Sequence, residues 1–372
     1  MKNNEICKEP KLCTGCETCA NICPRDAIRM KADWRGFLYP HIDQSLCTDC
    51  GLCQKRCPAN QPSKAPFHFD CAKVFIERDK TQLLRASSGG AFGAIARHII
   101  AEGGSVIGCC MDKDYQVNYI CVNTLEDLAL LHGSKYVQST VGKIYRQAKK
   151  ILEDNHPVLF CGCPCQVAAL KQYLHKEYAR LITMDLICHG VPAQPYFRSY
   201  VKDLLRKKRK AGITIFRFRF KPEICQKIPY TPSAVYDGFH ARDFYMSYFL
   251  WGKGYRSCCY RCRYAGSSRE GDFTIGDFWN NRIAKLPIDD HLGASLVLCN
   301  TERAKQQEWI FQENGTYIPI HTLHDAVSDD GGQLKHPSKN DIRTNLIYLL
   351  YKIFGVAGPK ILFAFEKLRS RL

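Results

Sequence analysis

The segment "VLFCGCPCQVAAL", residues 158–170, decides how the central part of this chain folds. Its first apolar run predicts a buried strand, and the run after Pro164 predicts a helix. Proline suits the first position of a helix because its φ is fixed at a helical value. Three thiols, Cys161, Cys163 and Cys165, fall on the turn between the two elements. One such cysteine would most simply pack as a small apolar residue, but three on one turn indicate a metal-binding or redox site.

Strand-like and helix-like segments alternate on both sides of this turn. Strands are predicted at 72–78, 105–111, 157–162, 179–188, 213–220, 273–279 and 294–300. Helices are predicted at 90–104, 141–155, 164–175, and around 243–251 and 301–313. This alternation favours βαβ units on a mostly parallel sheet, an α/β fold that binds ligands at the C-terminal edge of its strands. Cys165 and Cys188 each follow a strand, so we expect both at that edge.

Two cysteine runs occupy the first sixty residues. "CTGCETCANICP" (13–24) and "CTDCGLCQKRCP" (47–58) both read C-x2-C-x2-C-x3-C-P, the spacing of bacterial two-cluster ferredoxins. In that arrangement the fourth cysteine of each run ligates the other 4Fe–4S cluster. The predicted ligand sets are Cys13, Cys16, Cys19 and Cys57 for one cluster, and Cys47, Cys50, Cys53 and Cys23 for the second. Zinc or disulfides would not favour a doubled run that ends in Cys-Pro.

The local composition of the chain predicts a hairpin, a linker and the domain boundaries. "GFLYPHID" (36–43) predicts a small hairpin inside the cluster module, and "NQPSKAPF" (60–67) reads as a linker that would separate this module from the rest. The predicted domains are a two-cluster ferredoxin module (1–62), an α/β catalytic region (70–320) and a C-terminal amphipathic helical tail (321–372). We expect the module to fold largely through its clusters, because it holds little apolar core.

Cysteine use and charge narrow the class of protein. The chain has 372 residues and 22 cysteines, and its start, "MKNNEICKEPKLC", lacks the apolar segment of a secretion signal. We therefore expect a cytoplasmic protein whose thiols bind metal or carry out redox chemistry. The formal charge is +17, but each 4Fe–4S cluster with its thiolates subtracts about two charges, leaving roughly +11 with three clusters. The basic run at 206–210 reads as a solvated helix end, and no nucleic-acid-binding pattern is present.

A second group of thiols lies later in the sequence. "SCCYRC" contains Cys258 and the C-x2-C pair Cys259 and Cys262, on an irregular segment. With Cys165 and Cys188, this pair gives four thiols, the ligand count of a third 4Fe–4S cluster or of a structural zinc. The isolated cysteines are interpreted as buried small hydrophobes: Cys109, Cys110, Cys121, Cys225 and Cys299.

Together these motifs resemble the beta subunits of coenzyme F420 hydrogenases and dehydrogenases, a family that includes the 7-hydroxymethyl chlorophyll a reductases. The matching segments are "SSGGAFGAIA" (87–96), "GSKYVQS" (133–139), "CGCPCQ" (161–166), "DLICHGVP" (185–192), "CYRC" (259–262), "GDFW" (276–279) and "GASLVLCNT" (293–301). The resemblance implies a flavoprotein that binds FAD beside an iron–sulfur cluster. Relatives usually lack cysteine at positions 161 and 163, which leaves the roles of these two thiols open.

Carried over by position, the FAD site comprises Ser87, Ser88, Gly89, Gly90, Lys135, Tyr136, Gln138 and Ser139. The residues themselves agree in part, because "SSGG" opens a helix whose free N–H groups suit a pyrophosphate. Lys135 would add positive charge, although Lys135 and Tyr136 could equally lie on a surface loop. His189 is the candidate proton donor, with a structural role as the alternative. Asp277 would orient a cofactor or cap a turn.

The C-terminal residues contain apolar runs interrupted by charges. Lys352, Lys360 and Gly358-Pro359 disfavour a membrane-spanning helix, so we predict two amphipathic helices broken at Gly358-Pro359. Residues 341–372 carry six lysines or arginines and two acids. This composition is consistent with docking on an anionic membrane surface, and with packing on the chain's own core or on a partner subunit.

The leading functional hypothesis is an iron–sulfur flavoprotein oxidoreductase. Electrons would pass between the ferredoxin clusters and FAD, and from FAD to a soluble deazaflavin-like or other organic substrate. The second hypothesis is an electron-transfer subunit docked on a catalytic partner protein, with no substrate of its own. The third is a non-enzymatic zinc and iron–sulfur scaffold.

Overall fold

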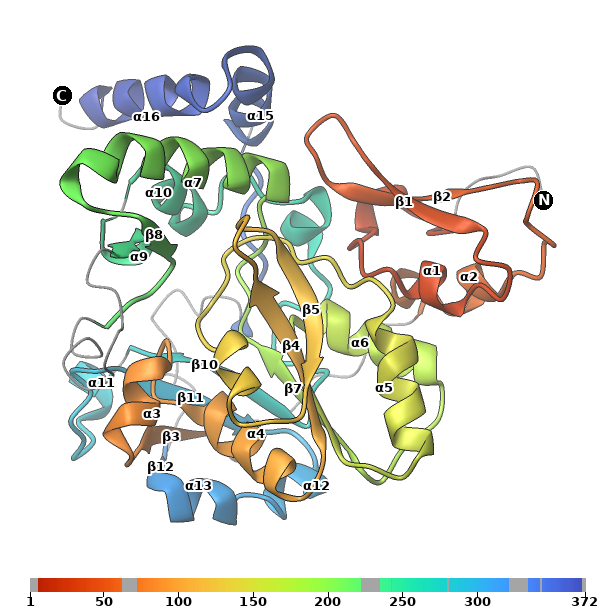
Figure 1. Ribbon diagram of the computed structural model, residues 1–372, viewed down its shortest axis with the longest axis vertical. Helices are drawn as coiled ribbons and strands as arrows, with labels where there is room; N and C mark the ends of the chain where they lie inside the picture. The colour runs from red at the N-terminus through yellow and green to blue at the C-terminus, as the bar shows by residue number, and fades with distance from the viewer. Residues whose placement is uncertain are drawn as a thin grey trace.

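A computed structural model describes residues 6–61, 72–221, 235–241, 243–279, 281–320, 334–341 and 343–369. The cluster module contains α1 (Thr18–Ile22), α2 (Leu52–Lys55) and the antiparallel strands β1 (Ile28–Ala32) and β2 (Leu38–Ile42). The two strands are the predicted hairpin. The module lies to one side of the α/β region in Figure 1. Most of the linker predicted at 60–67 lies outside the described residues.

An eight-stranded mixed sheet organises the rest of the chain. Its strand order is β12-β3-β11-β10-β7-β6-β4-β5. The strands are β3 (Ala72–Glu77), β4 (Ser105–Met111), β5 (Val117–Val122), β6 (Val158–Gly162), β7 (Leu181–Leu186), β10 (Phe273–Phe278), β11 (Ala294–Cys299) and β12 (Gly315–Pro319). The predicted α/β fold is confirmed, with its parallel part in the four neighbours β10, β7, β6 and β4. The outer pairings are antiparallel.

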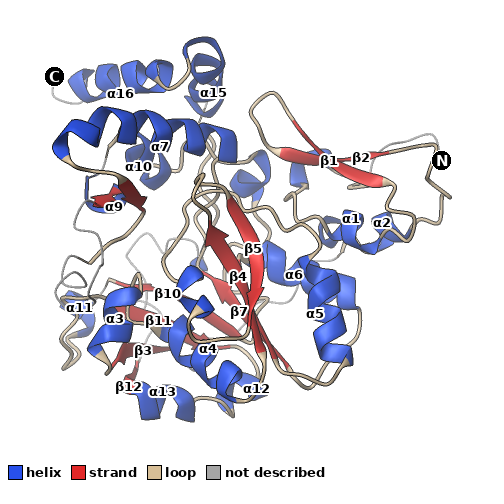
Figure 2. Ribbon diagram, in the orientation of Figure 1, coloured by secondary structure: helices blue, strands red, loops and turns tan. Residues whose placement is uncertain are grey.

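Helices cover both faces of this sheet (Figure 2). The first face is covered by α4 (Ala91–Ala101), α12 (Glu302–Lys305) and α13 (Trp309–Asn314), whose apolar side chains pack on β3, β4, β6, β7, β10 and β11. The second face is covered by α5 (Ile144–Glu153) and α6 (Pro164–Leu174), which pack on β4, β6 and β7. The short helices α3 (Lys80–Arg85) and α11 (Asn281–Ala284) lie near the antiparallel end of the sheet.

A separate aromatic cluster joins a helical cap that lies at one end of the molecule (Figure 1). The cap contains α7 (Gln194–Lys208), β8 (Ile215–Arg217), β9 (Val235–Asp237), α9 (Gly238–Ala241), α10 (Phe244–Leu250), α15 (Arg343–Phe354) and α16 (Ala357–Arg369). Stacked and edge-on rings hold it together; Phe197, for example, stacks on Phe218 at 4.8 Å. Phe37 of the cluster module belongs to the same core and packs on Tyr348 at 5.6 Å.

The cluster module packs directly on the α/β region, although the linker was expected to separate the two. Three arginines of the α/β region hold the module through its backbone carbonyls. Arg146 donates to Asn21 O (2.8 Å), Arg256 to Cys13 O (2.8 Å) and Arg263 to Ala59 O (2.7 Å). Module and α/β region therefore share an extensive polar interface, which a linker motif in the sequence does not reveal.

Smaller differences concern element ends. The strand predicted at 213–220 extends only over Ile215–Arg217, and the helix predicted around 301–313 is divided into α12 and α13. The two tail helices exist, but the chain breaks at Gly355 (φ +58°), and Pro359 lies in the first turn of α16. Proline is tolerated there because first-turn N–H groups have no intrahelical acceptor. Among the described helices, none is both long and apolar enough to cross a bilayer.

Candidate functional site

A cavity of about 470 Å³ lies where the carboxyl ends of β4, β6, β7 and β10 meet the helical cap. Most of the residues predicted to bind FAD line this cavity: Ser87, Ser88, Gly90, Lys135, Tyr136, Gln138 and Ser139. The thiols of Cys161, Cys163, Cys165 and Cys188 also line it. Thr14, between two cysteines of the first cluster run, reaches the same wall. The structure therefore brings three predicted sites to one cavity.

The N-terminus of α4 forms one end of the cavity. Gly90 is the N-cap with φ +95°, and no side chain caps this end of the helix. A Cβ atom at Gly90 would lie 2.9 Å from Glu77 Cβ, so glycine is required by both conformation and space. The uncapped first turn faces the cavity through Ala91 and Phe92. Such a helix end attracts anions.

The serines ahead of α4 anchor its loop. Ser87 Oγ accepts a hydrogen bond from Ser134 N (2.7 Å), and Ser88 Oγ donates to Ala294 O (2.5 Å). Gly89 does not line the cavity. A Cβ atom there would lie 2.1 Å from Phe75 O, so its role is close packing on the sheet.

Lys135 supplies a buried positive charge at the cavity. Its ammonium donates to Leu131 O (2.9 Å) and His132 O (3.0 Å), and no carboxylate of the described residues forms an ion pair with it. Burial lowers the pKa of Lys135 to about 8. Burial also lowers the pKa of His132 to about 4, which Lys135 reinforces. A buried cation without an acidic partner favours an anionic ligand.

The turn at 161–166 has the predicted strand-to-helix geometry. Cys163 is the N-cap of α6, and Pro164 is its first residue. Gln166 completes a capping box by accepting from Cys163 N (3.0 Å), and Tyr119 OH also donates to it (2.7 Å). A Cβ atom at Gly162 would lie 2.1 Å from Tyr119 OH, so the turn requires glycine at this position.

Burial decides the pKa of Cys165. A helix N-terminus lowers the pKa of a nearby thiol, but burial raises the pKa of Cys165 well above its ordinary value. Burial outweighs the helix dipole because a thiolate loses its hydration in the interior. Repulsion from Cys188, Cys262, Cys258 and Cys16 adds to the shift. These thiols therefore lie within electrostatic range of Cys165.

Two thiol pairs within this group lie close enough to shift each other's pKa. Cys188 raises the pKa of Cys163, and Cys163 lowers that of Cys188. In the second pair, Cys259 lowers the pKa of Cys258, and Cys258 raises that of Cys259. The group thus contains two thiols beyond the four predicted ligands.

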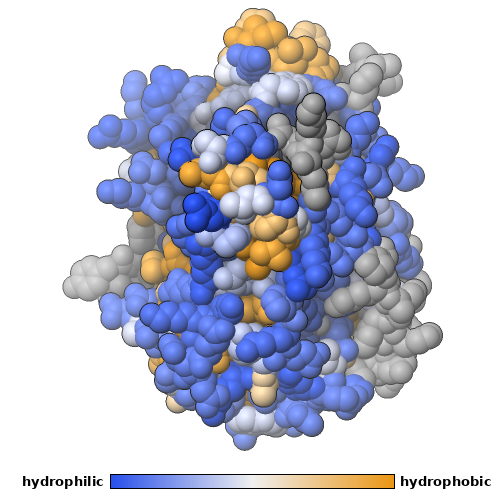
Figure 3. Space-filling view, turned by 90° about the vertical axis from the view of Figure 1, so that its right-hand side faces the viewer, coloured by the Kyte–Doolittle hydropathy of each residue, from blue (hydrophilic) through white to orange (hydrophobic). Residues whose placement is uncertain are grey.

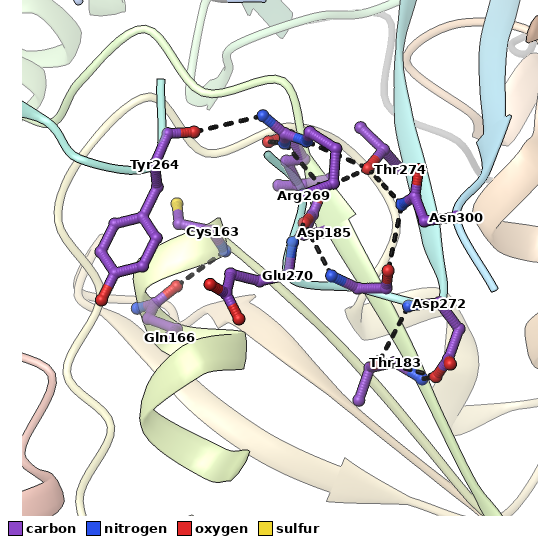
Figure 4. Close-up of polar contacts among 12 residues, drawn as sticks. Cys163, Gln166, Thr183, Asp185, Tyr264, Arg269, Glu270, Asp272, Thr274 and Asn300 are labelled. Atoms are coloured by element: carbon purple, nitrogen blue, oxygen red, sulfur yellow. Dashed lines mark hydrogen bonds and ion pairs between the residues drawn. The ribbon is translucent and has the colours of Figure 1, made fainter. Parts of the chain in front are cut away.

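A buried polar network fixes the segments that carry Cys188 and Cys262 (Figure 4). Asp185, at the end of β7, pairs with Arg269 at 2.7 Å, and both side chains are almost completely buried. Asp185 also accepts from Thr274 Oγ1 (2.6 Å) and from the backbone N–H groups of Glu270 and Gly271 (both 2.8 Å). Arg269 reaches back to Tyr264 O (3.3 Å). The network ties β7, β10 and the chain after Cys262 into one unit.

The cluster module provides two further thiol groups. Cys23, Cys47, Cys50 and Cys53 line a small cavity of about 50 Å³, which matches the set predicted for the second cluster. Of these cysteines, Cys50 is exposed. In the first set, the thiols of Cys13, Cys16 and Cys19 lie within electrostatic range of one another. Cys57 lies near Cys7, a thiol that the ferredoxin spacing does not include, and Cys7 contributes to raising the pKa of Cys57.

Arg256 occupies the junction between the module and the cavity region. It has no exposed surface, and its guanidinium donates to Cys13 O (2.8 Å), Leu38 O (2.9 Å) and Gln138 Oε1 (3.2 Å). It also approaches Cys13 Sγ at 3.7 Å. Burial raises the pKa of Cys13 to about 11, and Arg256 opposes that shift. Gln138 in turn donates to Thr14 O (3.3 Å).

Aromatic side chains and one ion pair form the remaining wall. Tyr136 packs on Phe249 at 4.7 Å, and Trp279 stacks on Phe239 at 6.3 Å. His189 lines the cavity with its ring 6.4 Å from that of Phe249. Asp277 lines the cavity and pairs with Arg219 at 2.6 Å. This pair lies beneath Phe239, whose ring is 4.7 Å from the guanidinium.

Some site residues were missed or misassigned from sequence. Cys299 is fully buried, as predicted. Cys109 was also predicted to be a buried hydrophobe, but it lines the cavity near Cys161. Cys225 lies outside the described residues. The sequence does not mark Arg256 or Arg269 as site residues, because single arginines occur throughout the chain and these two belong to no recognisable motif.

Single-ion coordination is not seen in the described part of the chain. No group of three or more histidine, cysteine or acidic side chains there is arranged to hold a metal ion. This includes the eight cysteines of the ferredoxin runs.

The docked cysteine module and the thiol-lined cavity are typical of an iron–sulfur electron-transfer protein, and comparison with protein families relates the chain to oxidoreductase subunits. A family profile described as "4Fe-4S dicluster domain" matches residues 12–61. A second profile, which describes the C-terminal part of the coenzyme F420 hydrogenase/dehydrogenase beta subunit, matches residues 156–317. Residues 156–317 are thus related to the coenzyme F420 hydrogenase/dehydrogenase beta subunit family, and a dicluster domain lies ahead of them in the same chain. The predicted family is confirmed.

Comparison with individual proteins adds little detail. A chain in the structure of the F420-reducing [NiFe] hydrogenase complex from Methanosarcina barkeri is 15% identical, with a TM-score of 0.44. The similarity covers 81% of this chain and 93% of that chain. A search of curated proteins gave no significant match.

Proposed function

We propose that this chain is an FAD-dependent iron–sulfur oxidoreductase. Electrons pass between the dicluster domain and FAD held in the cavity, and reach a soluble organic substrate, deazaflavin-like or of another kind. The observation that carries this proposal is the shared cavity wall, where Thr14 of the dicluster domain meets the residues predicted to bind FAD. Bound FAD would supply the coupling between one-electron clusters and two-electron organic chemistry.

The cavity residues suit the parts of FAD. A volume of about 470 Å³ lies within the range of cofactor and ligand pockets. The uncapped N-terminus of α4 and the buried ammonium of Lys135 would hold the phosphates. Tyr136 and Phe249 offer apolar ring surface on the wall. His189, on the same wall, is the proposed proton donor to the substrate.

The thiol groups suit three clusters. The eight cysteines of the dicluster domain would hold two, in the sets given by their spacing. Cys165, Cys188, Cys259 and Cys262 would hold the third, between the dicluster domain and the cavity. Cys16 lies within electrostatic range of Cys165, and Thr18 Oγ1 donates to Ala169 O of α6 (3.2 Å). The first cluster loop thus packs directly on the helix that carries Cys165.

We expect about twelve iron atoms and one FAD per chain after anaerobic purification and reconstitution, because three 4Fe–4S clusters contain that much iron. Iron, acid-labile sulfide, zinc and flavin analysis measures this. About eight iron atoms with stoichiometric zinc would assign the third site to zinc. A preparation with full iron that takes up no flavin would contradict the FAD proposal.

FAD affinity should depend on pH through Lys135. Its pKa is lowered from 10.5 to about 8, so it is charged below that pH and neutral above it. Replacing Lys135 by methionine should weaken FAD binding about 10- to 100-fold near pH 7, as expected for hydrogen bonds to a charged group. Wild-type affinity should fall as the pH rises through about 8, and the variant should lose this dependence.

Fluorescence titration with FAD at several pH values measures both effects. Lys143→Met serves as the control, because Lys143 is exposed and does not line the cavity. The same shift predicts that the FAD-free protein gains stability between pH 8 and about 10.5, because the unfolded chain then binds more protons. Equal pH profiles in wild type and Lys135→Met would show that Lys135 does not contact the phosphates.

The second candidate is an electron-transfer subunit without its own substrate. The exposed Cys50 favours it, because a partner protein could exchange electrons directly with the second cluster. Turnover of deazaflavin or other organic acceptors by the purified chain with dithionite separates the two candidates. Activity of the isolated chain supports the oxidoreductase, whereas cluster reduction without turnover supports the electron-transfer role.

A further inference from the structure

The outer face of α15 and α16 is an unusually apolar surface. Of the fifteen large hydrophobic side chains exposed among the described residues, seven lie on these two helices. They are Leu346, Leu349, Ile353, Phe354, Ile361, Phe365 and Leu368, with exposed fractions of 37–67%. Scattered exposed hydrophobes are ordinary, but such a concentration marks an interaction site. We call these seven residues the outer apolar face.

This face does not arise from a loosely attached tail. The inner side of the helices is fixed in the aromatic core through Ile347, Tyr348 and Phe363. Tyr348 OH accepts from Ala193 N (3.0 Å) and donates to Gly254 O (2.7 Å). Tyr351 OH donates to Pro195 O of α7 (3.1 Å). The helices therefore pack on the chain's own core with one side and present the outer apolar face on the other.

The charges around the face have one sign. Lys352, Lys360 and Lys367 are exposed on the same two helices. The only acid between residues 343 and 369 is Glu366, which is 15% exposed and accepts from Arg343 Nη1 at 3.2 Å. Across the described residues of these helices, the surface thus combines bulky apolar side chains with exposed cations and no exposed carboxylate. Pairing with a second copy would bring like charges together, which is unfavourable.

The placement of the helices suits a flat binding partner. Both lie along one end of the molecule, where Figure 3 shows hydrophobic surface at the top. Neither spans a bilayer, so binding would be peripheral. Amphipathic helices bind lipid interfaces by inserting apolar side chains while lysines attract anionic headgroups.

We propose that the outer apolar face binds the surface of a membrane that contains anionic lipid. Phe354, Ile361 and Phe365 enter the headgroup region, and the three lysines contact lipid phosphates. This inference is independent of the proposed redox function. With three lysines near the surface, affinity for anionic over zwitterionic vesicles should differ on the order of 100-fold at low salt.

Vesicle flotation with the full-length, cluster-loaded protein tests the proposal. Vesicles of phosphatidylcholine mixed equally with phosphatidylglycerol are compared with phosphatidylcholine alone. We expect binding to the mixed vesicles, weakened by salt and abolished in the double variant Ile353→Glu/Phe365→Glu. The matched control is Leu125→Glu/Leu130→Glu, which changes two exposed leucines elsewhere.

Three outcomes would overturn the proposal. The first is equal binding of the double variant and wild type, and the second is no binding of wild type to anionic vesicles. The third is concentration-dependent self-association of wild type that the double variant loses, since the face would then join two copies. Unchanged iron content and circular dichroism establish that the variants are folded.

Discussion

Replacing Arg269 by methionine should lower the free energy of unfolding by about 3–5 kcal/mol, the cost of breaking a buried ion pair from one side. Asp185 would keep its bonds from Thr274 and from two backbone N–H groups, but its charge would remain buried without a counterion. The variant should also lose the bonds of Arg269 to Leu186 O and Tyr264 O. Anaerobic urea unfolding followed by circular dichroism measures the change.

The control for this variant is Arg206→Met. Arg206 pairs with Asp203 at 2.9 Å, but its side chain is 77% exposed, and exposed pairs contribute at most about 1 kcal/mol. Arg269→Lys should be intermediate, because lysine keeps the charge but cannot donate to Asp185, Leu186 and Tyr264 together. A loss below about 1 kcal/mol in Arg269→Met would mean that the pair contributes little.

Arg269 also shows what the sequence could not reveal. Asp185 lies in the "DLICHGVP" segment, which directed attention to the cysteine and histidine rather than to the acid. Its partner is distant in sequence, and their contact depends on the parallel pairing of β10 with β7. Long-range polar partners of this kind follow from topology, which short motifs do not contain.

Secondary-structure elements were predicted well where a local sequence pattern determines the backbone directly. The strand, turn and helix around 158–174 formed as expected, because an apolar strand, a glycine and a proline each restrict the local backbone. The antiparallel strands on both sides of the parallel core were harder to predict. An apolar strand buried on both faces has the same sequence pattern whether its neighbour is parallel or antiparallel.

The packing of the dicluster domain on the α/β region was the largest feature of the fold that the sequence did not predict. The linker-like residues after Asn60 suggested independence, yet Arg146, Arg256 and Arg263 all bond to carbonyls of the dicluster domain. Arginines that hold backbone carbonyls have no characteristic spacing. The raised pKa of Cys165 was equally hidden in the sequence, because the degree of burial depends on segments distant in sequence.

The final prediction concerns the turn at 161–166. We expect Cys165→Ser to abolish the EPR signal of the third cluster and to stop electron flow between the dicluster domain and the flavin. Cys165 matches the cysteine of the family motif, lines the cavity and lies within electrostatic range of Cys188 and Cys262. A serine hydroxyl is a poor replacement for a thiolate ligand of iron.

Cys163 provides the matched comparison because it is two residues away on the same turn. Its side chain takes part in the capping box of α6, so Cys163 has a structural role that needs no iron. Cys163→Ser should retain the cluster, since serine also caps helices and donates hydrogen bonds. Cys163→Ala should retain the cluster but shift its reduction potential downward, because hydrogen bonds to cluster sulfurs help to set that potential. EPR-monitored redox titration of the three variants distinguishes these roles. If Cys163→Ser loses the cluster while Cys165→Ser keeps it, Cys163 is the ligand. Cys163 and Cys188 would then bind the same iron–sulfur cluster.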